Sequence, residues 1–493
     1  MISAAGARMT RGRVAAIAMT PLPALVGVQV AAGGALRLVA VAGVGVVLVG
    51  SIAATAMRGR VKNYMAIELP VLLLLASQVN LVVRSEEQVA VGPDPSSGAG
   101  VFRLALTALA MLMAANALIS LTSGVASARL SRPYRMYALY VGVVFAGAIF
   151  SVAPEVTAHR GVELSAALLV TAAALRSGGP AAMSRLETVL FGWVKALLVA
   201  VWIGVGVSPS LAIVPYPDSP IPYQIRGVFP SMASNTVGTV GMTVALWSLA
   251  TLFGSERERI KSRLAYYAWA AFGFISLIAS QYRTGYVAFA GGVAALLVLR
   301  KKKALVAVTV LVLVVTGAVG GESLVNTAQP YVLRGQTPQE AQRLSGRWYW
   351  WTQAIPVWQE SPLLGNGLIA GTRFEVLAEL TEKEIGNIHS TWMEALVGTG
   401  VLGTGLLAVF ALTVWRRAVL DALRGSGRLV PAVLGSALLV RSFSGTTFED
   451  SGDAALLLLI FALSLPPPAS IGRKRREMGF LPHAQRITVG TPS

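Results

Sequence analysis

Two arginines and one histidine of this sequence stand near the edges of apolar segments, and a third arginine lies in a polar stretch. Arg226 and Arg283 carry guanidinium groups, which stay charged at any physiological pH and can bind two phosphate oxygens at once. His389 is one of three histidines, and an imidazole exchanges protons near neutral pH. Arg347 precedes Trp351 in a polar stretch of the chain. If these groups share one face of the protein, they predict a diphosphate site beside a proton-transfer residue.

Each of these residues also has a simpler interpretation. An arginine at the end of a membrane helix can extend its side chain to the lipid headgroups. A histidine there can act as an interfacial hydrogen-bonding residue. Arg283 departs most from this alternative, because it lies in the tightest turn of the chain, Gln281–Gly285, with apolar residues on both sides.

The composition is that of a membrane protein. Hydrophobic residues make up 55% of the 493 residues and charged residues only 13%, with a mean hydropathy of +0.65. Soluble globular chains are about 25% charged. The apolar runs are roughly 16–25 residues long without strict alternation, which favours helices over barrel strands. We therefore expect an all-α polytopic transmembrane helix bundle with about 12–14 spans and one long outer-face loop that carries short helices.

The spans are placed from the apolar runs. They cover 14–32, 36–57, 64–83, 101–123, 136–153, 164–175, 188–212, 231–254, 264–281, 284–299, 304–320, 390–414, 429–444 and 453–466. The segments 164–175 and 284–299 are short enough to be re-entrant or interfacial instead. Four regions are expected: an N-terminal transmembrane bundle (1–320), a large outer-face loop (321–389), C-terminal transmembrane helices (390–466) and a basic cytoplasmic tail (467–493).

The basic residues predict the orientation. The formal net charge is +18, and the lysines and arginines gather in every second loop. Because basic loops remain in the cytoplasm, both termini are expected there, with Ile213–Pro230, Gln281–Gly285 and Glu322–His389 on the outer face. The basic clusters are short and spread over many loops, so nucleic acid is not an expected partner.

Neither a metal nor another cofactor is expected. The chain has no cysteine, which excludes thiolate ligands and a cysteine nucleophile. His159 and His483 are far from His389 in the sequence, and no cluster of histidine and aspartate has the spacing of metal ligands.

Several short motifs resemble those of one bacterial family. Two segments are similar to sequence motifs of the O-antigen ligases and polymerases. They are Arg226-Gly227-Val228-Phe229 followed by Asn235, and Tyr282-Arg283-Thr284-Gly285. The turn from Ser361 to Gly367 (SPLLGNG), and then His389 followed by Gly400-Val401-Leu402-Gly403, also match in order. The resemblance covers about Tyr223 to Leu412. Ser390 is a departure, because many members have asparagine after the histidine.

The resemblance implies a function and roles for residues. Members of this family transfer a glycan from an undecaprenyl-diphosphate carrier to an acceptor on the outer face of the bacterial cytoplasmic membrane, without a metal. By resemblance, Arg226 and Arg283 hold the diphosphate and His389 acts near the acceptor hydroxyl, in an inverting reaction. The substrate-binding residues implied beside them are Arg347, Trp351, Asn235, Gly365 and Asn366. The implied partners are a lipid-linked oligosaccharide donor, a glycan, lipid or protein acceptor, and membrane lipid.

Two other functions fit a polytopic chain. A secondary transporter or lipid-linked glycan flippase would use a charge within the membrane, for which Lys195 is the main candidate. A peptidoglycan polymerase would need an outer-loop carboxylate, and the run FEVLAELTEKE supplies glutamates that also fit a solvated helix face. Within the leading interpretation, a ligase and a polymerase have the same sequence features.

Overall fold

The structure is a computed structural model. It describes residues 65–79, 98–122, 132–176, 180–216, 221–254, 262–301, 347–377, 388–426 and 428–448, together with residues 452, 453, 456, 457 and 460. The predicted spans 14–32, 36–57 and 304–320, most of 453–466 and the tail 467–493 lie outside the described residues.

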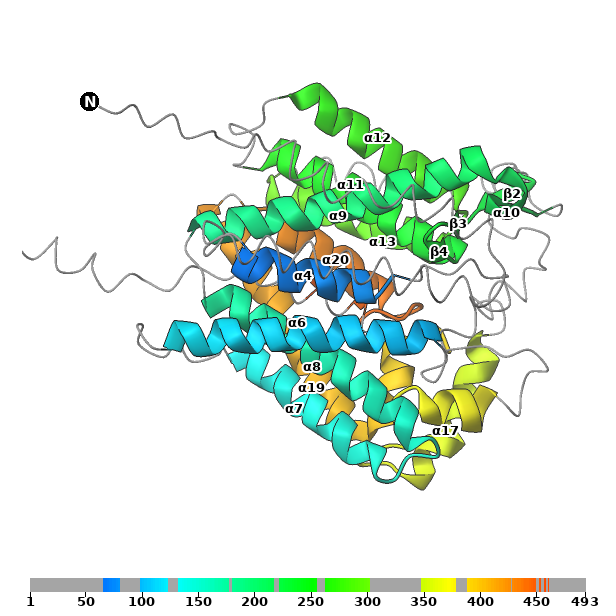
Figure 1. Ribbon diagram of the computed structural model, residues 1–493. Helices are drawn as coiled ribbons and strands as arrows, with labels where there is room; N and C mark the ends of the chain where they lie inside the picture. Colours follow the sequence, from blue (N-terminus) through cyan, green and yellow to red (C-terminus); the bar gives the residue numbers. More distant parts are fainter. Residues whose placement is uncertain are drawn as a thin grey trace, which may run out of the picture.

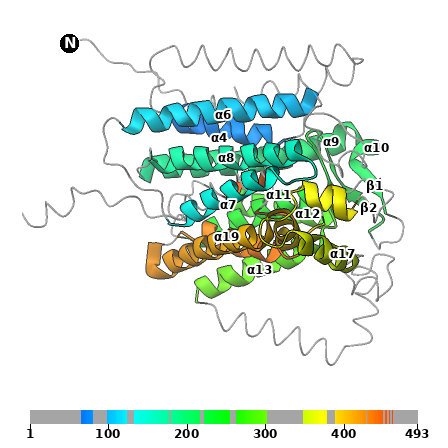
Figure 2. The ribbon, with the colours of Figure 1, turned by 90° about the horizontal axis from the view of Figure 1, so that it is seen from below.

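The described chain is a bundle of long helices that run side by side (Figures 1 and 2). The helices are α4 (Met65–Ser77), α6 (Gly98–Thr122), α7 (Arg132–Ala148), α8 (Pro154–Arg176), α9 (Pro180–Val207), α11 (Ser234–Phe253), α12 (Arg263–Ala279), α13 (Arg283–Leu299), α19 (Thr391–Asp421) and α20 (Val430–Arg441). Four segments are long and apolar enough to cross a membrane, namely Gly98–Leu118, Ser184–Val207, Ser234–Phe253 and Thr391–Arg424. The predicted all-α transmembrane bundle is confirmed at this level.

The observed helices correspond to the apolar runs, with one instructive difference. The run 164–175 was expected to form a short segment, whereas α8 extends from Pro154 to Arg176 over 23 residues. Its first part contains His159, Arg160 and Glu163, which lower the hydropathy without interrupting the helix. These charges are compatible with a helix in the bundle because they pair with one another and with Arg103.

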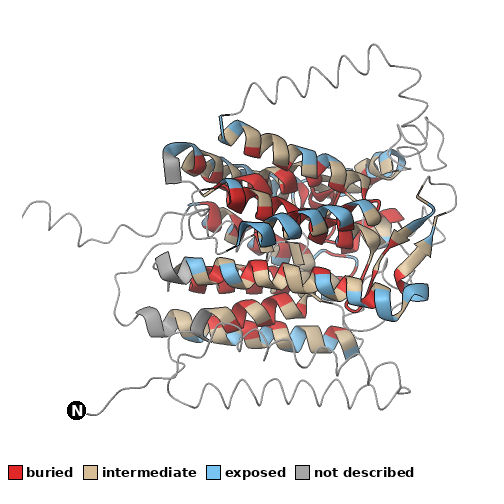
Figure 3. Cartoon of the chain, turned by 90° about the horizontal axis from the view of Figure 1, so that it is seen from above, coloured by how far each residue is buried: buried red, intermediate tan, exposed pale blue. Residues whose placement is uncertain are grey.

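Small residues let the helices approach closely. A Cβ added at Gly241 of α11 would lie 2.7 Å from the carbonyl oxygen of Gly273 in α12, so these two backbones are nearly in contact. Between α7 and α19 the contact is aromatic instead, with the rings of Tyr137 and Phe410 4.7 Å apart. Figure 3 shows the result, with buried residues where helices face one another and exposed residues on the outer faces.

Short elements gather at one end of the bundle, which we call the site end. They are α10 (Pro209–Ala212), two hairpins and α17 (Arg347–Glu360), and both ribbon views place α10, β2 and α17 there (Figures 1 and 2). In the first hairpin, β1 (Ile213–Pro215) pairs antiparallel with β2 (Tyr223–Ile225), with Ile213 opposite Ile225. In the second, β3 (Gly227–Val228) pairs with β4 (Ser231–Met232).

Two π-helical turns complete the described elements. One, η2 (Gly371–Leu377), follows α17, and the other, η3 (Ala422–Ser426), ends α19. The turn η2 packs against the first turn of α19, so the long loop predicted before His389 contains short helices where it is described.

Candidate functional site

His389 lies in a strained link just before α19. Its φ of +54° is in the left-handed region, which residues other than glycine rarely adopt. The link is held from one side by α17, because the indole nitrogen of Trp351 donates a 3.0 Å hydrogen bond to the carbonyl oxygen of Ile388. The ring of Trp350 lies 6.0 Å from that of His389. Strain of this kind persists only where surrounding contacts impose it, and such contacts often serve a function.

The first turn of α19 holds the link from the other side. Ser390 is the N-cap residue and accepts a hydrogen bond from the Met393 amide. The carboxylate of Glu394 is completely buried, accepts from the Thr372 hydroxyl of η2, and lies 3.5 Å from the Ile388 amide nitrogen. A carboxylate at a helix N-terminus is also favoured by the helix dipole.

The end of α20 is joined to the same turn. The Thr391 amide lies 3.1 Å from the Ser442 carbonyl oxygen and 3.2 Å from that of Gly445. The Thr391 hydroxyl accepts from the Thr447 amide at 2.9 Å. The histidine therefore stands where α17, α19 and the end of α20 meet.

The helix starts that carry Arg347 and Arg283 are joined through Ser444. Arg347 Nη1 donates a 2.9 Å hydrogen bond to the carbonyl oxygen of Ser444. The Ser444 hydroxyl lies 3.1 Å from that of Thr284, the residue after Arg283. Arg347 and Arg283 are each the first residue of a helix, and neither α17 nor α13 has an acidic residue in its first turn. A cation at a helix N-terminus is unfavourable, so both positions favour an anion nearby.

Arg226 is positioned by the first hairpin. It follows β2, and its Nε donates to the carbonyl oxygen of Leu211 at 2.5 Å. The side-chain amide of Gln281 donates to the carbonyl oxygens of Ile221, at 2.8 Å, and Tyr223. The hairpin that carries Arg226 is thereby attached to the turn that carries Arg283.

Three further residues predicted to bind substrate have local contacts. Asn235, at the start of α11, accepts a 2.8 Å hydrogen bond from the Thr236 amide through its side-chain oxygen. The side-chain amide of Asn366 donates to the Val357 carbonyl oxygen at 2.9 Å. Gly365 has a φ of +71°, and a Cβ there would lie 2.5 Å from the carbonyl oxygen of Val397. Their role in substrate binding stays a prediction.

The turn that contains Gly365 and Asn366 is hydrogen-bonded to α19 at a point where the helix is interrupted. At Gly400 the backbone is not helical, with φ +61° and ψ −170°. The amides of Asn366 and Gly367 donate to the carbonyl oxygens of Val397, at 2.8 Å, and Gly398, at 3.1 Å. In return the Pro362 and Leu363 carbonyl oxygens accept from the amides of Val401 and Leu402, at 2.9 and 3.3 Å. The turn thus supplies hydrogen bonds that the interrupted helix cannot make itself.

The environment of His389 favours its neutral form. Burial lowers its pKa, and the positive charges of Arg347 and Arg441 lower it further, to about 4. Burial also lowers the pKa of Arg347, against the opposing effect of Tyr282. At neutral pH the imidazole is therefore uncharged, which is the form of a histidine side chain that can accept a proton.

Sequence reasoning missed Arg441, Tyr282 and Asp453 as members of this site. Arg441 is the last residue of α20, and its side chain contacts both Tyr282 and Asp453. A signal was present, since Arg441 stands inside the predicted apolar span 429–444, where a charge requires a partner. Lys195, the charge predicted to be buried, instead lies 4.4 Å from the centre of the Phe191 ring and is only partly buried.

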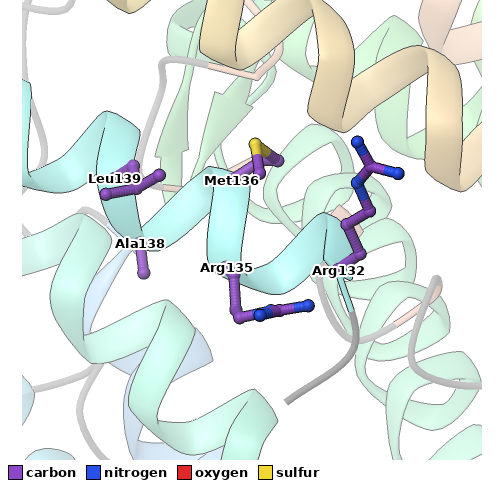
Figure 4. Close-up of a pocket in the computed structure, with 5 residues that line it drawn as sticks. All are labelled: Arg132, Arg135, Met136, Ala138 and Leu139. Carbon is purple, nitrogen blue, oxygen red and sulfur yellow. The ribbon is translucent and has the colours of Figure 1, made fainter.

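One hollow in the described chain lies away from His389. This hollow, of about 550 Å³ at the start of α7, is lined by Arg132, Arg135, Met136, Ala138 and Leu139 (Figure 4). It lies at the end of the bundle away from His389, because the opposite end of α7 contacts the turn before Gly365 through Gly147. Among the residues that the structure describes, no three histidine, aspartate or glutamate side chains gather as metal ligands would.

Fold and site together define a class of protein, a helical membrane protein with arginines and a neutral histidine at one end of its bundle. Residues 268–408 match the family described as O-antigen ligase. The matched segment extends from α12 into α19 and contains Arg283, Arg347 and His389. This match supports assigning the chain to the O-antigen ligase family, as the motifs predicted. The curated proteins that were compared include no match.

Proposed function

We propose that this protein transfers a glycan from an undecaprenyl-diphosphate carrier to an acceptor hydroxyl on the outer face of the cytoplasmic membrane. The family supports glycan transfer of the O-antigen ligase or polymerase type. The observation that carries the proposal is the arrangement around His389, a histidine that is neutral at pH 7 beside Arg347 and the turn of Arg283.

The arginines fit the donor. In the described part of the chain, Arg226 and Arg347 contact backbone carbonyl oxygens, and no carboxylate neutralises either one. Guanidinium groups held in this way keep their charge available for the two phosphates of a lipid carrier. Arg226 and Arg283 hold the diphosphate in this proposal, and Arg347 contacts it from the side of α17.

The reaction needs one bond to form and one to break. The acceptor oxygen attacks the anomeric carbon, and the bond from that carbon to the diphosphate oxygen breaks, which inverts the anomeric configuration. Negative charge grows on the leaving diphosphate, so arginines placed beforehand stabilise the transition state more than the bound substrate. His389 accepts the acceptor proton, and no metal or nucleotide takes part.

The proposed sidedness follows from the helix ends. Four arginines lie toward the end of the bundle opposite His389: Arg132 and Arg263 begin α7 and α12, Arg300 follows the last residue of α13, and Arg416 lies in the last part of α19. Under the positive-inside rule that end faces the cytoplasm and the site faces outward. Single cysteines at Gln336 and Ser426 test this arrangement in intact cells. An impermeant maleimide should label the first and not the second, and labelling of Ser426→Cys would place the site on the wrong side.

The central experiment is transfer by the purified protein. Undecaprenyl-diphosphate glycan is supplied in detergent with EDTA, together with either a lipid-core acceptor or a second lipid-linked glycan. Product with the first acceptor identifies a ligase, and chain growth with the second identifies a polymerase. Movement of the lipid across vesicle membranes without any new glycosidic bond would favour a flippase and contradict the proposal.

A further inference from the structure

Arg441 is a buried cation that neither the motifs nor the proposed mechanism uses. Its side chain lies at the end of α20 and only 8% of the residue is exposed. Nη1 donates to Asp453 Oδ2, and Nε donates to the Tyr282 hydroxyl at 3.3 Å. A buried guanidinium needs such partners, because an uncompensated charge in the bundle is costly.

Tyr282 packs closely against two glycines. An added Cβ at Gly285 would lie 2.4 Å from the Tyr282 ring, and one at Gly238 would lie 2.7 Å from the Tyr282 Cβ. On the far side, the hydroxyl is 3.1 Å from where a Cβ on Gly445 would lie. Tyr282 is the N-cap residue of α13 and directly precedes Arg283. Whatever fixes Tyr282 therefore fixes the backbone from which Arg283 extends.

We infer that Arg441, held by Asp453, is a positioning residue that clamps Tyr282 and so aims Arg283 at the donor diphosphate. This inference rests on the proposed function. It assigns to the end of α20 a role in the site that lies outside the segment matched to the family, residues 268–408.

Arg441 has a second effect, on His389. The charged groups that act on this histidine are Arg347 on α17 and Arg441 on α20. Three other titratable groups contact the neighbours of His389: Tyr282 acts on Arg347, Asp453 pairs with Arg441, and Glu394 lies near the Ile388 amide. Arg347 and Arg441 both oppose protonation of His389. Removing the charge of Arg441 should therefore raise the pKa of His389.

Imidazole NMR tests this effect without any transfer reaction. The chain has three histidines, so protein labelled only at histidine gives three imidazole signals, and His389→Gln identifies one of them. In Arg441→Gln the His389 pKa should rise from about 4 toward its ordinary value. The matched control is Arg185→Gln, which removes the arginine of another helix–helix ion pair, 3.3 Å from Glu68. An unchanged His389 pKa in Arg441→Gln would contradict this second effect of Arg441.

Transfer kinetics of two milder variants test whether Tyr282 and Arg441 position Arg283. Tyr282→Phe keeps the ring and loses only the hydroxyl, and Arg441→Lys keeps the charge and loses the planar fork. Each should lower kcat/KM for the lipid donor by roughly tenfold or more, because small misplacements of a positioned group are costly, while KM for the acceptor stays unchanged. Wild-type kinetics in both variants overturn the clamp. Failure of the proposed function is separate, since it would show as absent transfer by the wild-type protein.

Discussion

Two buried polar clusters lie at the site end of this bundle, and they differ in how their charges are balanced. The first, the Glu163 cluster, joins α6 and α8. Arg103 and Arg160 donate to opposite oxygens of Glu163 at 2.8 and 3.0 Å, and His159 lies 3.5 Å from the same carboxylate. The second is the site around His389, with Arg347 and Arg441.

The Glu163 cluster is centred on an anion of the protein itself. Glu163 is 1% exposed and accepts hydrogen bonds from residues on two helices, so it joins α6 to α8. The site around His389 is not centred on a carboxylate in this way. Arg347 contacts a backbone carbonyl oxygen, and the described carboxylates nearby, Asp453 and Glu394, face Arg441 and the Ile388 amide.

The comparison separates structure from function. Buried arginines that surround a carboxylate are satisfied by the fold, and they need no ligand. Arg347, which contacts a backbone carbonyl oxygen and no described carboxylate, keeps a positive charge that the anionic donor neutralises under the proposed function. The two histidines provide matched tests, because His159 and His389 each lie beside arginines at the same end of the bundle.

The largest expected effect is on transfer in the two histidine variants. His389→Ala should lower the rate of glycan transfer by about 10²–10⁴-fold, the usual contribution of a general base. His389→Gln should be nearly as slow, because glutamine cannot accept a proton at neutral pH. His159→Ala should retain transfer per folded molecule. Near-normal turnover by His389→Gln would mean that the histidine only positions the acceptor and that the proton goes to water or to a phosphate oxygen.

A similar contrast applies to the arginines. Arg283→Lys and Arg226→Lys keep the charge but lose bidentate contact, so each should reduce transfer by up to roughly 10²-fold at normal membrane levels. Arg160→Lys, in the Glu163 cluster, is the control and should leave the rate unchanged. Full activity of both site variants would indicate arginines that only reach for lipid headgroups.

In contrast to the rate of transfer, the free energy of unfolding should change most in the Glu163 cluster. Glu163→Gln leaves the partly buried Arg103 and Arg160 without this counter-charge, and breaking a fully buried ion pair costs about 3–5 kcal/mol in other proteins. Denaturant unfolding in detergent should therefore detect a large loss, while transfer per folded molecule stays normal. A variant as stable as the wild type would show that the arginines find other partners and that the cluster is not structural.

The smallest effect expected near neutral pH is in the pH profile. His389 must be neutral to accept a proton, and its pKa is lowered to about 4 by burial and by Arg347 and Arg441. Transfer should stay constant from pH 8 down to about 5 and fall only near pH 4. A fall in transfer near the ordinary histidine pKa of about 6.5 would contradict a lowered pKa of His389.

The same shift predicts how folding depends on pH. The pKa of His389 is lower in the folded than in the unfolded protein, so the unfolded chain binds the proton first as the pH falls. The contribution to stability is fully present above about pH 6.5 and is lost progressively as the pH falls toward 4. His389→Gln should flatten this part of the stability curve.

Much of the fold follows from the sequence alone. A lipid environment requires internal backbone hydrogen bonds, so an apolar run of sufficient length becomes a helix whatever its neighbours are. The runs 101–123, 231–254 and 264–281 accordingly match α6, α11 and α12 within a few residues. The order of short motifs was enough to indicate the family, because Tyr282–Gly285 and the turn before Gly367 belong to the segment that the family comparison matched.

Only the tertiary structure decided what each charge in the site faces. Arg441 and Asp453 are separated by twelve positions, and Tyr282 by far more, yet the three side chains meet because α13 packs along α20. The break at Gly400 depends in the same way on a turn from another part of the chain. A sequence shows which residues carry charge, but the pKa of His389 and the partner of each arginine depend on distances between helices, which packing alone determines.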